Sequence, residues 1–299
     1  MIHGIINVYK EKGFTSHDVV AKLRGIVGQK KIGHTGTLDP DATGVLPVCL
    51  GKATKLCDLL TDKNKTYEAV LLLGKTTDTQ DITGEVLEEK STEALTEEKV
   101  REAIEGFIGD YEQIPPMYSA LKVNGKKLYE LAREGKVIER KARPVKILDI
   151  QILEIDLPKV RMEVSCSKGT YIRTLCHDIG EKLGCGGCME SLIRTRVSTF
   201  RIEDAKTLDG IETLKQEGKL AELLVPIDAM FPSYPKITVK DDWKAFAKNG
   251  NPLDLKMLKE ACGQDEETQV RLYDESGKFI AIYQWKEKKY HIVKMFFNE

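Results

Sequence analysis

A glycine- and proline-rich stretch, residues 33–55, constrains this chain more than any other part of its sequence. It begins Gly-His-Thr-Gly-Thr-Leu-Asp-Pro-Asp-Ala-Thr-Gly over residues 33–44. Glycines and prolines among apolar residues predict a backbone that bends sharply, and neither a helix nor a plain strand. Asp39 lies inside the predicted bend, and Pro40 follows it directly.

The charges around Asp39 indicate chemistry on an anionic polymer. A carboxylate repels phosphate, so it would be a poor choice for merely binding such a polymer. An aspartate before a proline also commonly begins a turn, and the local sequence leaves both interpretations open. A Walker phosphate-binding loop is excluded, because its glycines are separated by four residues and a hydroxyl residue follows its lysine. The lysines that flank the bend are Lys30, Lys31, Lys52 and Lys55.

Length and composition predict a globular protein. The chain has 299 residues, of which 41% are hydrophobic, enough for one large domain and a small one. No apolar run reaches the roughly 18 residues that a membrane-spanning helix needs. The N-terminus lacks the basic-then-apolar layout of a signal peptide, so we expect a cytoplasmic protein with no membrane contact.

The cysteines predict neither disulfides nor a metal site. There are seven of them, an odd number, in a chain with no export signal. Cys185 and Cys188 have the spacing of metal ligands, with Cys176 and His177 upstream. A structural zinc site needs a second compact pair, which is missing. We therefore expect reduced thiols in a glycine loop.

Charge is distributed unevenly along the chain. The net charge is only −1, which argues weakly against a nucleic-acid partner. Basic residues nevertheless outnumber acidic ones over residues 1–75 and 117–201, whereas residues 76–116 are acidic. This pattern fits a one-sided footprint for nucleic acid, and it equally fits solvated charged faces. Charge alone does not decide between them.

Hydrophobic periodicity predicts alternating strands and helices up to about residue 225, followed by a β-rich tail. Prolines at 226, 232 and 235 mark the boundary. In the first part we expect strands at 4–10, 67–74 and 160–167, and helices at 17–27 (capped by Ser16, ended by Gly28), 56–60, 96–107, 126–133 and 174–183. In the tail we expect strands at 270–273, 279–285 and 291–297, a short helix at about 241–248 and a hairpin turn at 274–277.

The stretch at 33–44, with Leu-Gly-Lys-Ala-Thr-Lys after it, resembles the signature loop of the TruB-type tRNA pseudouridine synthases. Three further strings resemble motifs of the same family in family order, at residues 10–16, 65–79 and 166–173. Glu11 stands where the first of these motifs usually has proline. The resemblance covers residues 4–230.

This resemblance implies a fold of the α/β (α+β) class. We expect a mixed, largely antiparallel pseudouridine-synthase sheet with flanking helices, followed by a small β-rich, PUA-like C-terminal domain. The implied catalytic domain spans residues 1–233 and includes an RNA-binding thumb at about 125–146, where basic residues are in excess. The implied PUA-like RNA-binding domain spans residues 234–299.

The resemblance also implies the reaction, in which uridine 55 of the tRNA T loop becomes pseudouridine. The N1–C1′ glycosidic bond is cut and the base rejoins through C5, a rearrangement that needs no cofactor or metal. Asp39 is the implied nucleophile or base, and attack at C1′, addition at C6 and removal of the 2′ proton all stay open. Tyr67 would stack on the uracil and help proton transfer at C5. Arg173 would pair with Asp39 and keep it ionised.

Five further residues are expected to bind substrate. His34 would fill or brace the space that the flipped base vacates, because the target must leave its stack to be reached. Leu192 would close the apolar side of the pocket, although Ile193 stands where arginine usually follows. The others lie in matched motifs: Lys10, Lys55 and Tyr171.

The implied partner is the T-arm stem-loop of tRNA, bound by a monomer that needs no obligate protein partner. Two other classes stay open from the sequence. A non-catalytic tRNA-folding protein would use the same basic surface but would not need Asp39 and Arg173 together. A guide-RNA-dependent relative within a ribonucleoprotein would be expected to carry extra segments for its partner proteins.

Overall fold

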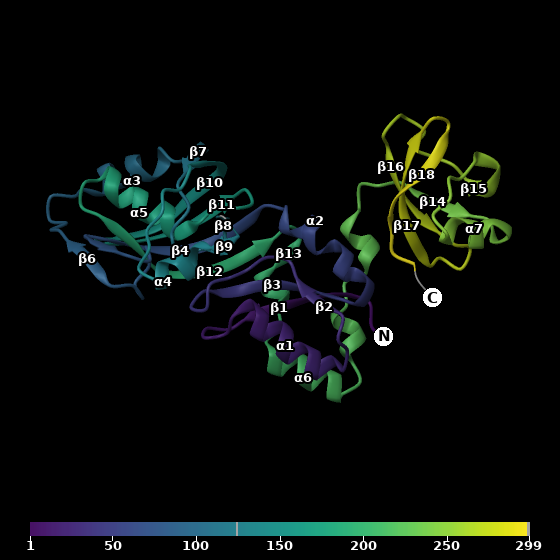
Figure 1. Ribbon diagram of the computed structural model, residues 1–299, viewed down its shortest axis with the longest axis horizontal. Helices are drawn as coiled ribbons and strands as arrows, with labels where there is room; N and C mark the ends of the chain where they lie inside the picture. The colour runs from purple at the N-terminus through teal and green to yellow at the C-terminus, as the bar shows by residue number, and fades with distance from the viewer. Residues whose placement is uncertain (124, 298–299) are drawn as a thin grey trace.

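The computed structural model describes residues 1–123 and 125–297, with a large sheet-based unit followed by a small C-terminal unit (Figure 1). The large sheet has the strand order β1-β3-β12-β4-β11-β10-β7, with β2 beside β3 and β13 beside β12. Among its described strands only β3 and β12 pair in parallel, which confirms the predicted mixed, largely antiparallel sheet. The strands are β1 (Gly4–Lys10), β2 (Ile32–His34), β3 (Thr43–Leu50), β4 (Lys65–Leu73), β7 (Gly109–Gln113), β10 (Arg143–Asp156), β11 (Lys159–Cys166), β12 (Gly187–Val197) and β13 (Phe200–Arg201).

Helices cover the sheet in two separate groups, each with its own core. At one end α1 (Ser16–Val27) and α6 (Leu208–Gln216) lie side by side against β1 and β3 (Figure 1). At the other end α3 (Glu97–Glu105) and α5 (Ile172–Lys182) pack on β4, β10 and β11. The shorter elements are α2 (Cys57–Thr61), α4 (Leu128–Arg133), β5 (Lys75–Thr77), β6 (Val86–Glu89), β8 (Lys122–Val123) and β9 (Lys126–Lys127).

The C-terminal unit is a small β-rich sheet, as the tail pattern predicted, but it has five strands and only the last three of them were predicted. Its order is β15-β14-β16-β17-β18, and it encloses an apolar core of its own. A second apolar cluster joins it to the large unit, because Ile282 and Phe296 pack with Ile5 and Val45. Its elements are β14 (Lys236–Val239), α7 (Lys244–Lys248), β15 (Leu258–Glu260), β16 (Gln269–Tyr273), β17 (Phe279–Lys286) and β18 (Lys289–Met295).

The prediction of bent backbone after residue 42 is wrong, because residues 43–50 form the strand β3. Pro47 lies in its middle, opposite Asn7 of β1. The carbonyl of Asn7 accepts from the Lys206 amide on the side of β1 away from β3. The backbone of Asn7 therefore forms no hydrogen bond with Pro47. The nitrogen of Pro47 therefore faces the gap between β12 and β2, where its missing N–H leaves no ladder bond unmade.

Several helix starts also differ from expectation, and two of them concern the candidate site. Thr15, not Ser16, caps α1: its side chain accepts from the Asp18 amide while the Asp18 carboxylate accepts from the Thr15 amide. Ser16 is thereby available to accept from the amide of Leu38 at 2.9 Å, which ties α1 to the signature loop. Helix α5 begins at Ile172, so Arg173 lies in its first turn.

Candidate active site

The signature loop, residues 35–42 between β2 and β3, is held in place by a buried lysine of β1. The ammonium of Lys10 donates to the carbonyls of Pro40 at 3.0 Å and Ala42 at 2.5 Å. Burial lowers the pKa of Lys10 to about 8, although the carboxylates of Asp39 and Asp41 oppose the shift. Lys10, predicted to bind substrate, therefore lies beneath the loop and fixes its shape.

A buried arginine that the sequence reasoning did not single out holds the loop from the side. Arg194 of β12 donates from Nε to the Val45 carbonyl at 2.8 Å and from Nη1 to the Thr37 carbonyl at 3.4 Å. Gly44 has a φ of +104°, and a Cβ there would lie 2.3 Å from the Arg194 carbonyl oxygen. Only glycine allows β3 to approach β12 this closely.

Asp39 and Arg173 meet at the loop, as the resemblance implied. Both Asp39 carboxylate oxygens lie 3.3 Å from Nη2 of Arg173. The Asp39 side chain is 41% exposed, whereas that of Arg173 is only 8% exposed. The carboxylate is thus open to an incoming ligand, and the guanidinium that stabilises its negative charge is screened little by water.

Arg173 is fixed by further groups, among them the Thr79 carbonyl, which accepts from Nη1 at 3.5 Å. Its Nη2 donates to the Tyr118 carbonyl at 2.8 Å, and its Nη1 lies 3.5 Å from a carboxylate oxygen of Asp81. Asp81 was not predicted, because it stands in the acidic region between β5 and β6, two residues beyond the motif string at 65–79. The arginine therefore lies between two carboxylates, of which Asp81 is the more buried.

Tyr67 lies near Asp39 on the central strand β4, opposite Arg194 of β12. It is almost fully buried, and this burial raises the pKa of its hydroxyl. The guanidinium of Arg194 works in the opposite direction, and Asp39 is close enough to add to the rise. A protonated hydroxyl near Asp39 is able to donate or relay a proton.

Three of the predicted substrate-binding residues surround the loop. The ring of His34 is half-buried, contacts the Gly36 carbonyl through Nδ1 at 3.1 Å and meets His17 edge-on at 5.2 Å. Burial lowers the pKa of His34. Tyr171 precedes α5, and burial is the main cause of its raised pKa, with Arg173 and Asp39 close by. Leu192 is half-buried against the core that contains Tyr67.

Lys55 lies elsewhere, at the junction with the C-terminal unit. Its ammonium donates to the Met295 carbonyl at 2.7 Å. It follows β3, whereas Asp39 precedes that eight-residue strand, so the two are separated by roughly 25 Å of extended chain. The structure does not bring Lys55 together with Asp39.

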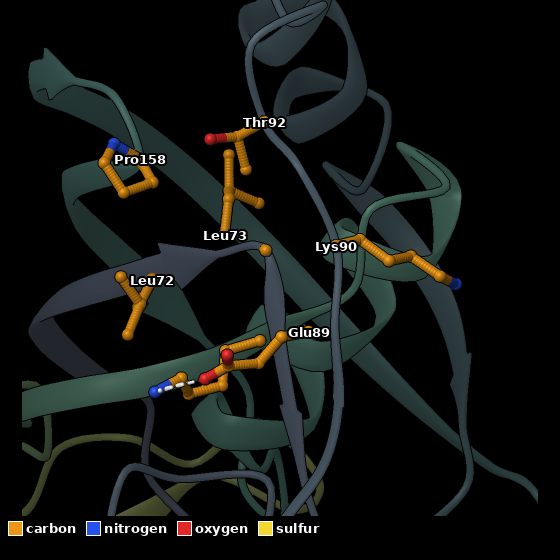
Figure 2. Close-up of a pocket in the computed structure, with 8 residues that line it drawn as sticks. Leu72, Leu73, Glu89, Lys90, Thr92 and Pro158 are labelled. Carbon is orange, nitrogen blue, oxygen red and sulfur yellow. Dashed lines mark ion pairs between the residues drawn. The ribbon is translucent and has the colours of Figure 1, made fainter.

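A shallow pocket of about 290 Å³ opens where β4 runs into β5, beside Pro158 (Figure 2). Its lysines are both paired with glutamates, Lys75 with Glu89 at 2.9 Å and Lys90 with Glu88 at 3.0 Å. None of the predicted site residues lines this pocket, so it is not part of the candidate active site.

The cysteines are all free thiols, and Cys188 is the buried second residue of strand β12 and does not lie in a loop. Burial raises the pKa of both Cys185 and Cys188. Over residues 1–123 and 125–297, no cluster of three or more histidine, cysteine, aspartate or glutamate side chains is arranged to hold a metal ion. In the same ranges, no helix has the length and apolarity to cross a membrane.

Comparison with known proteins places this geometry in a family. Residues 24–172 match the family model described as TruB family pseudouridylate synthase (N terminal domain). Residues 173–232 match that of the tRNA pseudouridylate synthase B C-terminal domain. A Lachnoclostridium phytofermentans protein named tRNA pseudouridine synthase B is 58% identical, over 99% of this chain and 100% of its own. A Bacillus pumilus protein of the same name is 44% identical, over 98% of this chain and 96% of its own.

Solved structures give the same result for the fold. The chain is similar to one in the structure of an H/ACA RNP bound to a substrate RNA containing 2′-deoxyuridine, with a TM-score of 0.73 and 27% identity. That match covers 99% of this chain and 85% of the other. It is also similar to a chain of a Cbf5-Nop10-Gar1 complex, with a TM-score of 0.72 and 29% identity over 98% of this chain and 85% of the other. With its family models, its full-length relatives and its fold in agreement, this chain belongs to the TruB family of tRNA pseudouridine synthases.

Proposed function

We propose that this enzyme isomerises uridine 55 in the T loop of tRNA, with Asp39 as the catalytic nucleophile or base. One observation carries the assignment of Asp39: an exposed carboxylate lies 3.3 Å from a buried arginine, on a loop that buried side chains hold in place. The name that the full-length relatives share supports pseudouridine formation in tRNA, and the choice of uridine 55 rests on the motif resemblance.

The proposed chemistry uses few groups. The N1–C1′ bond breaks, a C5–C1′ bond forms, the C5 proton leaves and N1 gains a proton. Attack at C1′, addition at C6 and removal of the 2′ proton all start from an ionised Asp39, which the guanidinium of Arg173 stabilises. Tyr67 stacks on the uracil and helps the proton leave C5. Leu192 closes the apolar side, and His34 and Tyr171 contact the flipped nucleotide.

The resemblance to the family also supports a proposal for the domains, the RNA-binding surface and the working state of the enzyme. Residues 1–233 form the catalytic domain and residues 234–299 a PUA-like domain that binds RNA. The basic segment, residues 125–146, closes on the T-arm stem as a thumb. The enzyme acts as a monomer in the cytoplasm, without an obligate protein partner, a cofactor or a metal.

An Asp39→Asn variant tests the central assignment. We expect no detectable pseudouridine in an unmodified T-arm hairpin, measured by nucleoside analysis, while the dissociation constant for the hairpin changes by less than about threefold. Asp41→Asn is the matched control: it changes a neighbouring carboxylate that pairs only loosely with Lys12, at 3.9 Å. Turnover by Asp39→Asn would remove Asp39 from the chemistry, and product at a uridine other than 55 would overturn the site.

The same assay separates the two other classes. A tRNA-folding protein would bind the hairpin and leave every uridine unchanged. A guide-RNA-dependent synthase, the class suggested by the H/ACA likeness, would need an added guide RNA. Full-length relatives of up to 58% identity favour an enzyme that acts on tRNA directly.

A further inference from the structure

The distance between Asp39 and Arg173 depends on where the N-terminus of α5 lies. Arg173 is the second residue of that helix, and Asp39 belongs to a loop from a different part of the sheet. A contact of 3.3 Å between separate elements is lost if the helix start shifts by about 1 Å, a displacement that can cost roughly 10²-fold in rate. Side chains that fix the start of α5 therefore affect the reaction without touching the substrate.

Gln113 fixes this helix start on one side. Its amide nitrogen donates to the Tyr171 carbonyl at 3.0 Å, and its amide oxygen accepts from the Tyr171 amide at 2.8 Å. Gln113 is only 1% exposed, so water competes little for these two hydrogen bonds. Tyr111, two residues earlier on the same face of β7, bonds to Asp178 further along α5. The edge strand β7 thus holds α5 at two points.

Gln80 fixes the helix start on the other side. Its amide oxygen accepts from the Thr174 hydroxyl at 2.6 Å, and its backbone carbonyl accepts from the Met189 amide at 3.0 Å. Gln80 has a φ of +64°, which is uncommon for a residue other than glycine. It directly precedes Asp81, which lies 3.5 Å from Nη1 of Arg173. One residue therefore links β12, α5 and the second carboxylate.

We infer that Gln113 and Gln80 are positioning residues that hold Arg173 at Asp39 from opposite sides of the helix start. They contact residues 171 and 174, which flank Arg173, and they come from elements separate from each other in sequence. This inference rests on the proposed function, because it assigns their effect to the Asp39–Arg173 contact.

Gln113 is tested by a graded pair of variants in single-turnover reactions at saturating enzyme. Gln113→Met keeps the shape and removes both hydrogen bonds, whereas Gln113→Glu keeps the acceptor only. We expect the rate to fall about 10²-fold for Gln113→Met and less for Gln113→Glu, with RNA affinity within twofold of wild type. Gln151→Ala, an exposed glutamine on β10, is the control and should change neither quantity.

The background Arg173→Lys separates positioning from a general structural role. If Gln113 acts through the arginine fork, Gln113→Met should lower the rate in this background by no more than about twofold. An equal loss in both backgrounds, a parallel loss of RNA affinity, or a wild-type rate in a folded Gln113→Met protein would overturn the inference for Gln113.

Gln80 is tested by a double-mutant cycle with Thr174. This cycle can still be measured if a Gln113 variant does not fold or if Arg173→Lys has no measurable rate. Gln80→Ala and Thr174→Val each remove one end of the 2.6 Å hydrogen bond, and Thr174→Ser keeps it. We expect equal rate losses for the two single variants and the double variant, and a near wild-type rate for Thr174→Ser. Additive losses would overturn the inference. An inactive wild type would instead refute the proposed function, whereas an active wild type with insensitive glutamine variants would refute this inference alone.

Discussion

Two sets of cations in this chain act in different ways. One is the floor of the candidate active site, by which we mean Lys10 and Arg194, and the other is the basic segment, residues 125–146. In the floor, Lys10 and Arg194 are fully buried and donate to loop carbonyls. In the basic segment the cations are mostly exposed, and Lys126 pairs with Glu134 at 3.6 Å, with both side chains exposed. The first set gives shape to the loop, and the second set gives charge to a surface.

The two sets should therefore respond differently to mutation. Leaving a buried acceptor without its donor costs about 1–3 kcal/mol, whereas an exposed ion pair contributes about 0–1 kcal/mol. Changes in the floor should lower the rate and the stability together. Changes in the basic segment should lower RNA affinity and leave both the rate on bound RNA and the stability in place.

The largest effect is expected for Arg194→Met. This change leaves the carbonyls of Val45 and Thr37 without their charged donor and removes the cation beside Tyr67. We expect the free energy of unfolding in urea to fall by about 3 kcal/mol and the single-turnover rate to fall about 10²-fold or more.

Arg196→Met is the matched control, since Arg196 lies on the same strand but is exposed. Its free energy of unfolding should change by no more than about 0.5 kcal/mol. Equal stability losses for the two variants would show that the buried arginine contributes no more to the fold than the exposed one.

The next effect concerns Lys10 and pH. Its pKa is lowered from 10.5 to about 8, so in the folded protein its proton is lost as the pH rises through about 8. The neutral amine has one donor fewer for the loop carbonyls, which should slow the reaction. The cost of burying the charge is present below pH 8 and is relieved above it, so this residue's contribution to stability rises as activity falls.

Lys10→Met tests this sign, because it removes the titration and any pH effect on the RNA cancels in a rate ratio. We expect wild type to exceed the variant about 10²-fold at pH 7, with the ratio shrinking as the pH rises through about 8. Lys12→Met, at an exposed neighbour, should give a ratio near one throughout. A constant ratio for Lys10→Met would show that the ammonium charge does not hold the loop.

Much of the fold and of the candidate site could be predicted from the sequence, because the residues concerned lie in short motifs or follow short-range rules. Asp39, Tyr67 and Arg173 lie in strings whose residue order matches family motifs, so their meeting could be expected before any geometry was known. The strand 4–10, the hairpin at 274–277 and the stop of α1 at Gly28, with its φ of +70°, follow from short-range rules.

The missed residues depend on contacts between distant segments. Arg194 is an arginine on a strand that bears other charges, and only the sheet order reveals that it is buried between β3 and β4. Asp81 looks like one more acidic residue of an acidic region. Pro47 argued against a strand, and it fits only because the partner strands leave a gap beside it.

A smaller effect, on affinity alone, is expected in the basic segment. We would neutralise Lys126, Lys127 and Lys141 to glutamine but keep Arg140, whose guanidinium donates to the Pro115 carbonyl at 3.1 Å. Each lost phosphate contact should lower the slope of log affinity against log salt by roughly 0.7–0.9. Lys99→Gln, in the acidic region, is the control. An unchanged slope and affinity would refute the thumb assignment and leave Asp39 untouched.

The smallest effect is expected at the cysteine pair, which belongs to neither set. Cys188 is fully buried and Cys185 nearly so. Alanine is the better replacement, because a serine hydroxyl at the fully buried Cys188 would lose its contact with water. The double variant Cys185→Ala, Cys188→Ala should lose about 1 kcal/mol of stability per residue through the space left by sulfur. Its single-turnover rate should stay within twofold of wild type, with or without EDTA, because neither thiol is near Asp39 in the site described above. Stoichiometric zinc in the purified wild type, together with activity lost on its removal, would contradict this. It would also add a third way in which the chain fixes its active site, since β12 carries both Cys188 and Arg194.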